Sequence, residues 1–170
     1  MIVYRDAIAA DGPALNAMAE QSFRETFGAE YEPQDLAAYI AQAYGPDGLR
    51  ADLRDPAIRF HVALSDGAIV GYAKLSPLTL PAPDAEPGAA ELRQLYVMRT
   101  QHGTGIAAAL MEWTIAAARA DRAPALYLAV FAFNHRARAF YARYGFRHVG
   151  EMDFRVGSRV DRDQIWRLAL

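Results

Sequence analysis

The chain of 170 residues contains no cysteine. This absence excludes disulfide bonds, metal sites built from thiolates, and cysteine nucleophiles, so covalent chemistry has to use another side chain. Lysine is almost as scarce, because Lys74 is the only one among the 18 lysine and arginine residues. Together with abundant alanine, this bias is typical of a GC-rich bacterial genome rather than of one function.

Long apolar runs are also missing. No stretch approaches the roughly 20 consecutive apolar residues needed to cross a bilayer, and the first residues, MIVYRD, lack the charged-then-apolar pattern of a signal peptide. We therefore expect a cytoplasmic protein with no membrane partner. No basic helix or aromatic–basic repeat stands out, so we expect no nucleic-acid partner.

The net charge is −2, but acidic and basic residues are unevenly distributed along the chain. Residues 1–56 contain ten acidic residues and four arginines, whereas residues 91–170 contain seven acidic residues and twelve arginines. The first part could attract a cation and the second an anion. Two differently charged solvated faces would give the same pattern.

The hydrophobic content of 53% is enough for one substantial core, and we predict a single domain over residues 1–170. Alternation and turn residues predict strands at 2–7, 59–65, 68–76, 91–98, 125–131, 146–154 and 163–168. Helical spacing and capping residues predict helices at 11–27, 33–44, 46–53, 106–117 and 134–143. The turn Asp66-Gly67 indicates a β-hairpin. This order predicts an α/β or α+β fold, with a mixed sheet and helices on both faces.

A two-glycine turn, HGTGIA at 102–107, leads directly from an apolar strand into an apolar-faced helix. The first N–H groups of a helix have no internal partner and lie at the positive end of its dipole, so an anion such as phosphate can bind there. No acidic residue between Arg99 and Met111 would repel it. The alternative is a tight connection without a ligand. The P-loop pattern does not fit, because there is no Gly-Lys-Ser/Thr ending, and the dinucleotide-binding pattern does not fit, because the third glycine position is Ala108.

Two blocks of residues resemble the GNAT superfamily of acyl-CoA-dependent N-acetyltransferases. The first is ELRQLYVM at 91–98 with the glycine turn, which resembles the family's strand and pyrophosphate loop, although His102 stands where Gln or Arg is usual. The second is NHRARAFYARYGF at 134–146, which matches the family pattern Asn-x-x-Ala-x-x-Phe-Tyr-x-x-x-Gly-Phe. The resemblance implies a largely antiparallel sheet, acetyl-CoA as cosubstrate, and no metal.

The resemblance also implies roles for individual residues. Main-chain groups of the strand would hold pantetheine and polarise the thioester, and Tyr141 would assist the departing sulfur. Packing beside Phe140 is the alternative role of Tyr141, and a helix N-cap is the alternative role of Asn134. The cofactor-binding residues expected in this way are Leu95, Tyr96, Val97, His102, Gly103, Thr104, Gly105, Ile106, Ala107, Asn134 and Tyr141.

Glu91 is the candidate general base, directly or through water, because it begins the strand expected to carry the acetyl group. Strand alternation places Arg93, Leu95 and Val97 on the same face as Glu91. A solvated carboxylate at the strand end is the alternative. The histidines show no metal-ligand spacing.

The acceptor is expected to be a primary amine. Acidic residues in the N-terminal half, Glu25, Glu30, Glu32 and Asp35, favour a small cationic amine such as a polyamine, and a loose resemblance to the bacterial spermidine/spermine-like branch agrees. A peptide N-terminus or an amino acid is the alternative acceptor, and a longer acyl-CoA is the alternative acyl donor. A non-catalytic CoA sensor is the alternative to an enzyme. The family resemblance is also compatible with a homodimer.

Overall fold

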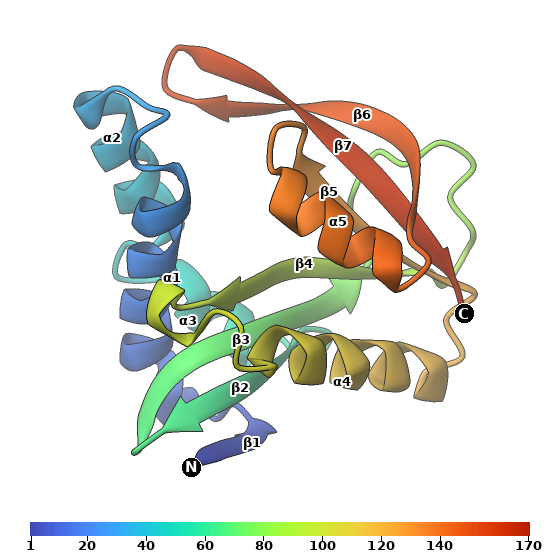
Figure 1. Ribbon diagram of the computed structural model, residues 1–170, viewed down its shortest axis with the longest axis horizontal. Helices are drawn as coiled ribbons and strands as arrows, with labels where there is room; N and C mark the ends of the chain where they lie inside the picture. Colours follow the sequence, from blue (N-terminus) through green and yellow to red (C-terminus); the bar gives the residue numbers. More distant parts are fainter.

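The computed structural model describes residues 1–170 (Figure 1). Its strands are β1 (Ile2–Asp6), β2 (Arg59–Ser65), β3 (Ala68–Pro77), β4 (Ala90–Val97), β5 (Ala125–Phe131), β6 (Arg147–Val156) and β7 (Arg159–Ala169). Its α-helices are α1 (Gly12–Phe27), α2 (Pro33–Ala43), α3 (Gly48–Arg54), α4 (Ile106–Ala120) and α5 (His135–Arg143). Short 3₁₀ helices, η1 (Ala9–Asp11) and η2 (Arg99–Gln101), precede α1 and follow β4.

Local sequence explains where the helices begin. Proline occupies the first turn of α1 and of α2, where its missing N–H costs nothing. Gly105 precedes α4 with φ +88°, a backbone conformation that favours glycine. The Asn134 side chain accepts a hydrogen bond from the Ala137 N–H and caps α5.

All seven strands form one sheet in the order β1-β2-β3-β4-β5-β7-β6. Neighbouring strands are antiparallel, except that β4 and β5 run parallel. The helix α4 supplies the crossover that a parallel pair requires. The predicted mixed, largely antiparallel sheet is therefore confirmed.

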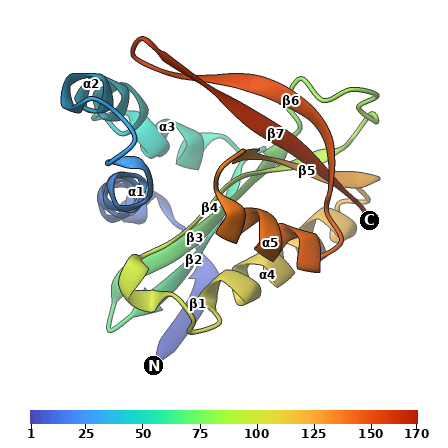
Figure 2. The same ribbon diagram turned by 45° about the horizontal axis from the view of Figure 1, so that its top comes forward.

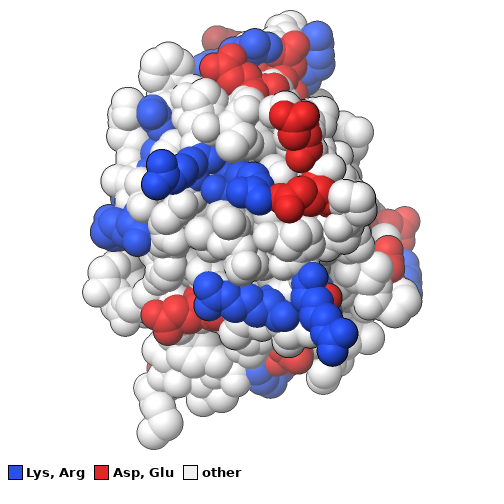
Figure 3. Space-filling view, turned by 90° about the vertical axis from the view of Figure 1, so that its right-hand side faces the viewer, with Lys and Arg blue, Asp and Glu red and all other residues white.

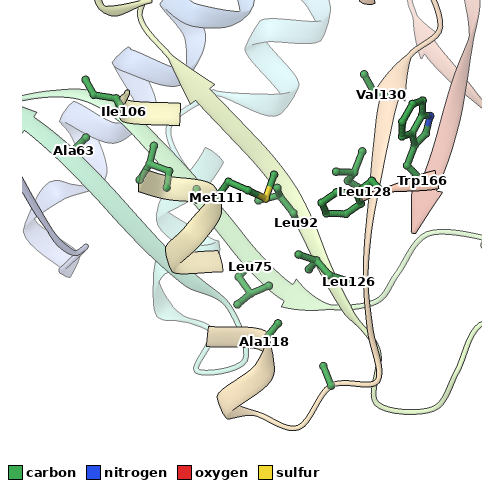
Figure 4. Close-up of a cluster of buried hydrophobic side chains, with 14 residues drawn as sticks. Ala63, Leu75, Leu92, Ile106, Met111, Ala118, Leu126, Leu128, Val130 and Trp166 are labelled. Carbon is green, nitrogen blue, oxygen red and sulfur yellow. The ribbon is translucent and has the colours of Figure 1, made fainter. Parts of the chain in front are cut away.

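Helices cover both faces of the sheet, as predicted (Figure 2). Helices α1, α2 and α3 cover one face, where Leu15 and Phe23 pack in a cluster with Phe60 and Tyr72 of the sheet. Helices α4 and α5 lie on the other face, where a second cluster fills the space between α4 and the strands (Figure 4). Its labelled members include Leu75, Leu92, Ile106, Met111, Leu126 and Leu128.

The parallel pair β4–β5 is very short. Only Ala90 with Leu126 and Glu91 with Tyr127 are paired, and beyond these positions the two strands separate. A register shift on the β3 side places Lys74 opposite Gln94 and Leu75 opposite Leu92, so Arg93 is an extra residue in β4. Such a bulge bends a strand and increases its twist.

The bulge overturns one prediction made from alternation. Glu91 pairs with Ser76, and Tyr96 pairs with Tyr72, so Glu91 shares its face with Gln94 and Tyr96 rather than with Leu95 and Val97. The reason is that one extra residue reverses the facing of every later side chain. Leu95 and Val97 instead pack with the α4 cluster, and Tyr96 packs with the α1 cluster.

The β6–β7 hairpin is longer than the sequence predicted. The predicted strands end at residue 154 and resume at residue 163, but the residues between them pair across the hairpin as far as Val156 and Arg159. The turn at Gly157, which has φ +59°, reaches α2 (Figures 1 and 2). The hairpin therefore joins the C-terminal half of the chain to the N-terminal helices.

Charged side chains of both signs share the face shown in Figure 3. Lysine and arginine side chains form short rows there, with aspartate and glutamate beside them. The arginine excess of residues 91–170 therefore does not form an uninterrupted basic surface on this side. No helix has the length and apolar character needed to span a membrane.

The α4 cluster predicts a large effect for one truncation. Leu110 is completely buried in it, so Leu110→Ala should lower the free energy of unfolding by about 3 kcal/mol through lost burial and a cavity. Ile8→Ala, at a site 59% exposed, should change it by less than about 0.5 kcal/mol. Urea denaturation measures both values, and equal effects would contradict this description of the core.

Candidate active site

A single cleft with a volume of about 1260 Å³ opens where β4 and β5 separate. Its walls come from α1, β4, the start of α4, β5, α5 and the β6–β7 hairpin. The separated strands leave main-chain groups of β4 without a strand neighbour on the β5 side. An extended ligand can therefore bind along this edge.

The glycine turn forms one end of the cleft. Gly103 and Gly105 have φ +82° and +88°, and no other group lies within 4 Å of where their Cβ atoms would be. No protein acceptor receives a backbone hydrogen bond from Gly103, Gly105, Ile106, Ala107 or Ala108. Five N–H groups without a protein partner, and no acidic residue in the first helical turn, make a site for an anion.

Two residues expected at this end have other contacts. The Thr104 hydroxyl donates to the Gln101 carbonyl at 2.7 Å, its N–H points to the same oxygen, and Thr104 does not line the cleft. His102 lies at the cleft and donates from Nε2 to the Val97 carbonyl at 3.1 Å, while Nδ1 accepts from Arg136. The imidazole thus holds the Arg136 guanidinium beside the glycine turn.

Arg136 is a residue that the sequence analysis did not select. It lies on α5 inside the matched block, at a position that the family pattern leaves free. Its contact with His102 places a positive charge at the end of the cleft that suits an anion. His102 itself stands where the family usually has Gln or Arg. The sequence signal that could have identified Arg136 was a basic residue two positions after Asn134, the cap of α5.

Tyr141 lines the cleft from α5, in contact with the rings of Phe140 and Phe146. Burial raises the pKa of its phenol to about 12. The phenol therefore stays protonated at neutral pH and can donate a proton. Asn134 also lines the cleft, and its observed contact is the helix cap.

Glu91 lies at the narrow end of the cleft, where β4 and β5 are still paired, and is 4% exposed. Its Oε2 accepts hydrogen bonds from the Thr79 N–H at 2.7 Å, the Thr79 hydroxyl at 2.8 Å and the Leu80 N–H at 3.2 Å. The carboxylate thus fixes the loop between β3 and β4, residues 78–89, against the sheet. Oε1 has no hydrogen-bond partner.

The only lysine also lines the cleft. The Lys74 ammonium is paired with Asp52 of α3 and lies 5.6 Å from the centre of the Phe60 ring. Burial lowers its pKa from the ordinary lysine value, although Asp52 opposes this shift. Its amino group is held by the protein on the α3 side of β3.

The opposite end of the cleft lies between α1, α2 and the β6–β7 hairpin. The Tyr31 hydroxyl donates to Asp161 at 2.8 Å, and Arg159 donates to the other oxygen of that carboxylate at 2.8 Å. Tyr39 and Phe154 form further parts of the wall, with their ring centres 5.6 Å apart. This end is aromatic and closed by contacts between the two halves of the chain.

The four acidic residues expected near the acceptor are dispersed. Only Glu25 lines the cleft, and its carboxylate accepts from the Arg99 N–H at 3.1 Å. Glu30 pairs with Arg159, and Asp35 accepts from Ser158 at the hairpin turn. Glu32 precedes α2 on the surface. The carboxylate that does line this end is Asp163, which the sequence analysis placed only at the start of a predicted strand.

Comparison with known proteins agrees with this architecture. Residues 16–146 match the model of the acetyltransferase (GNAT) family. An uncharacterized N-acetyltransferase of Mycobacterium tuberculosis strain H37Rv is 33% identical over 155 residues, which cover 91% of this chain and 95% of that protein. One from Lactobacillus delbrueckii subsp. lactis is 26% identical over 160 residues, which cover 94% and 92%.

Solved structures share the whole fold. The PaiA N-acetyltransferase of Thermoplasma acidophilum, in complex with coenzyme A, superposes with a TM-score of 0.80 at 21% identity and covers 100% of this chain and 99% of its own. A GCN5-related N-acetyltransferase from Rhodopseudomonas palustris gives a TM-score of 0.77 at 17% identity, covering 99% and 95%. The chain thus belongs to the acetyltransferase (GNAT) family. Its enzyme class is acetyl-CoA-dependent N-acetyltransferase.

The glycine turn gives a direct test of the anion site. Gly105→Asp should abolish binding of acetyl-CoA, because a carboxylate would oppose the pyrophosphate at the helix start. Gly105→Asn is the matched control, since asparagine has the same size, lacks the charge, and tolerates positive φ. Calorimetric titration with acetyl-CoA should find clearly tighter binding for the asparagine variant. Equal affinities of two folded variants would place the pyrophosphate elsewhere.

Proposed function

We propose that the protein transfers the acetyl group of acetyl-CoA to the primary amine of a small cationic molecule such as a polyamine. The transfer is direct, with both substrates bound at once. The observation that carries this proposal is the continuity of the cleft, which joins the unpaired N–H groups at α4 to an enclosed aromatic end beneath the hairpin.

The cofactor end fits the parts of coenzyme A. The unpaired N–H groups of Gly103 and of residues 105–108 suit the pyrophosphate, with Arg136 supplying a positive charge beside them. The main chain of Leu95, Tyr96 and Val97 lies where β4 has no strand partner, which suits the extended pantetheine arm. An N–H of this strand would polarise the thioester carbonyl.

The reaction needs one bond formed and one broken. The amine nitrogen, once deprotonated, attacks the carbonyl carbon, and the carbon–sulfur bond then breaks with the electron pair leaving on sulfur. Tyr141, which stays protonated at neutral pH because burial raises its pKa to about 12, would give its proton to the departing thiolate and recover one from the nitrogen as the amide forms. No cysteine exists to form an acyl-enzyme, and one continuous cleft can hold both substrates.

The shape of the acceptor end supports a small acceptor over a protein. The hairpin turn contacts α2 through Ser158 and Asp35, and Arg159 bonds to the Glu30 carbonyl. A Cβ atom on Gly157 would overlap Asp35, so this contact is close. A long peptide would have to displace these contacts, whereas a small amine would not.

The first experiment measures release of CoA from acetyl-CoA with spermidine, spermine, simple diamines, amino acids and a short peptide. Acceptor-dependent release with the cationic amines supports the proposal. Preference for the peptide or for amino acids would overturn the acceptor class. Tight acetyl-CoA binding without release for any acceptor would favour a CoA sensor.

The role of Tyr141 predicts a selective kinetic loss. Tyr141→Phe should lower kcat about 10-fold or more and leave the affinity for acetyl-CoA nearly unchanged, because one proton donor is removed. Tyr144→Phe removes a hydroxyl near the end of the same helix, outside the cleft lining, and should have little effect. Steady-state kinetics of both variants decide this, and equal kcat values would remove Tyr141 from the mechanism.

Glu91 remains the candidate general base, acting from Oε1 through water. Glu91→Gln should then lower kcat/KM about 100-fold. Thr79→Val breaks one contact of the same carboxylate while leaving the charge in place, so it separates the base role from anchoring of the loop. If the two variants lose activity equally, Glu91 is an anchor only.

A further inference from the structure

Asp163 is a carboxylate that the protein leaves without a partner. It lies on β7 opposite Phe131 of β5 and Met152 of β6, and all three residues line the acceptor end of the cleft. Its Oδ1 is buried and receives no hydrogen bond. Unpaired buried carboxylate oxygens are costly and rare, so this one requires an explanation.

The surroundings of Asp163 offer no compensating cation. Asp161, two residues earlier on the same face of β7, takes the hydrogen bonds of Tyr31 and Arg159. Tyr39 approaches from α2, where burial and the nearby Asp163 raise the pKa of its phenol to about 12. Burial and the charge of Asp161 raise the pKa of the Asp163 carboxyl to about 6.

The other acidic residues near this end are already in use. Glu25 accepts from the Arg99 main chain and from Gln21, and Glu30 is paired with Arg159. A cation that enters the acceptor end would therefore meet one unpaired carboxylate among aromatic rings. Aromatic faces also attract cations, which adds to the preference.

We propose that Asp163 binds a protonated amino group of the acceptor other than the amine that is acetylated, and that it selects amines carrying such a second charge over amines that lack it. This inference rests on the proposed acetyl transfer, and it names the side chain that binds the amine substrate of that reaction. The ammonium would supply the hydrogen bonds that the carboxylate lacks, and a charge-assisted contact of this kind is strong when partly buried. The unbound enzyme keeps an unfavourable charge that the substrate neutralises.

The proposal has a pH dependence with a defined sign. Below about pH 6 the carboxyl of Asp163 is largely protonated, so affinity for a cationic amine should fall as the pH drops from 7.5 to 5. The amine itself stays charged over this range. Two phenols face Asp163, and burial raises the pKa of both Tyr31 and Tyr39, so they stay protonated over this range. Arg159, beside Asp161, stays charged.

The experiment measures binding without turnover. Spermidine and 1,4-diaminobutane are titrated by calorimetry into the wild-type protein, Asp163→Asn and Asp153→Asn, each saturated with CoA. Asp153→Asn is the matched control, because it removes an exposed carboxylate, paired with Arg162, from the neighbouring strand β6. We expect Asp163→Asn alone to weaken amine binding about 10-fold or more and to abolish its pH dependence.

Thermal unfolding supplies a second readout. Because Asp163 is charged without a partner in the unbound enzyme, Asp163→Asn should raise the melting temperature at pH 7.5 while it weakens the binding of the amine. A variant that binds both amines like the wild type would overturn the proposal, as would a lowered melting temperature with unchanged binding.

The two proposals fail in different ways. If the wild-type protein binds CoA and acetylates amines without a second charge but binds neither the diamine nor spermidine, acetyl transfer stands and the role of Asp163 is wrong. If the protein does not bind acetyl-CoA, the proposed function itself is wrong.

Discussion

The structure depends on the early end of pairing between β4 and β5. Backbone N–H and C=O groups in a sheet interior are normally paired, because leaving them unpaired and dry is costly. Here the ladder stops after Glu91 and Tyr127, and the middle of a seven-stranded sheet becomes a binding edge. The bulge at Arg93 redirects β4 at this point, so the strand can leave β5 while it stays paired with β3.

The two ends of the resulting cleft have opposite electrostatic character. One end has unpaired N–H groups and the guanidinium of Arg136, and the other has the unpaired carboxylate of Asp163. An anionic carrier and a cationic acceptor would therefore enter from opposite ends. The net charge of the chain reveals little of this, because both groups lie within the arginine-rich residues 91–170.

Much of this arrangement was predictable from local sequence. Glycines, prolines, Asp66-Gly67 and the apolar spacing marked the elements, because these signals act over a few residues. The bulge was not predictable, since Arg93 continues an ordinary strand pattern and only its register with Lys74 and Leu75 shows the extra residue. The length of the β6–β7 hairpin was missed for a similar reason, because its polar residues are satisfied across the hairpin and against α2.

The site shows the same division between local and long-range information. The turn at residues 102–107 and the block at 134–146 marked the cofactor end, because each is contiguous in sequence. Asp163, Tyr31 and Tyr39 are brought together from β7 and the α1–α2 region, and no spacing in the chain relates them. The contact of His102 with Arg136 joins the glycine turn to α5 and depends on the fold in the same way.

The single lysine has a consequence for a protein that acetylates amines. Arginine carries the positive charge elsewhere on the chain, and a guanidinium stays protonated and is a poor nucleophile. The ε-amino group of Lys74 is itself held by Asp52. The chain therefore offers acetyl-CoA almost no side-chain amine of its own. Acetylation of its own side chains would compete little with acetylation of the acceptor.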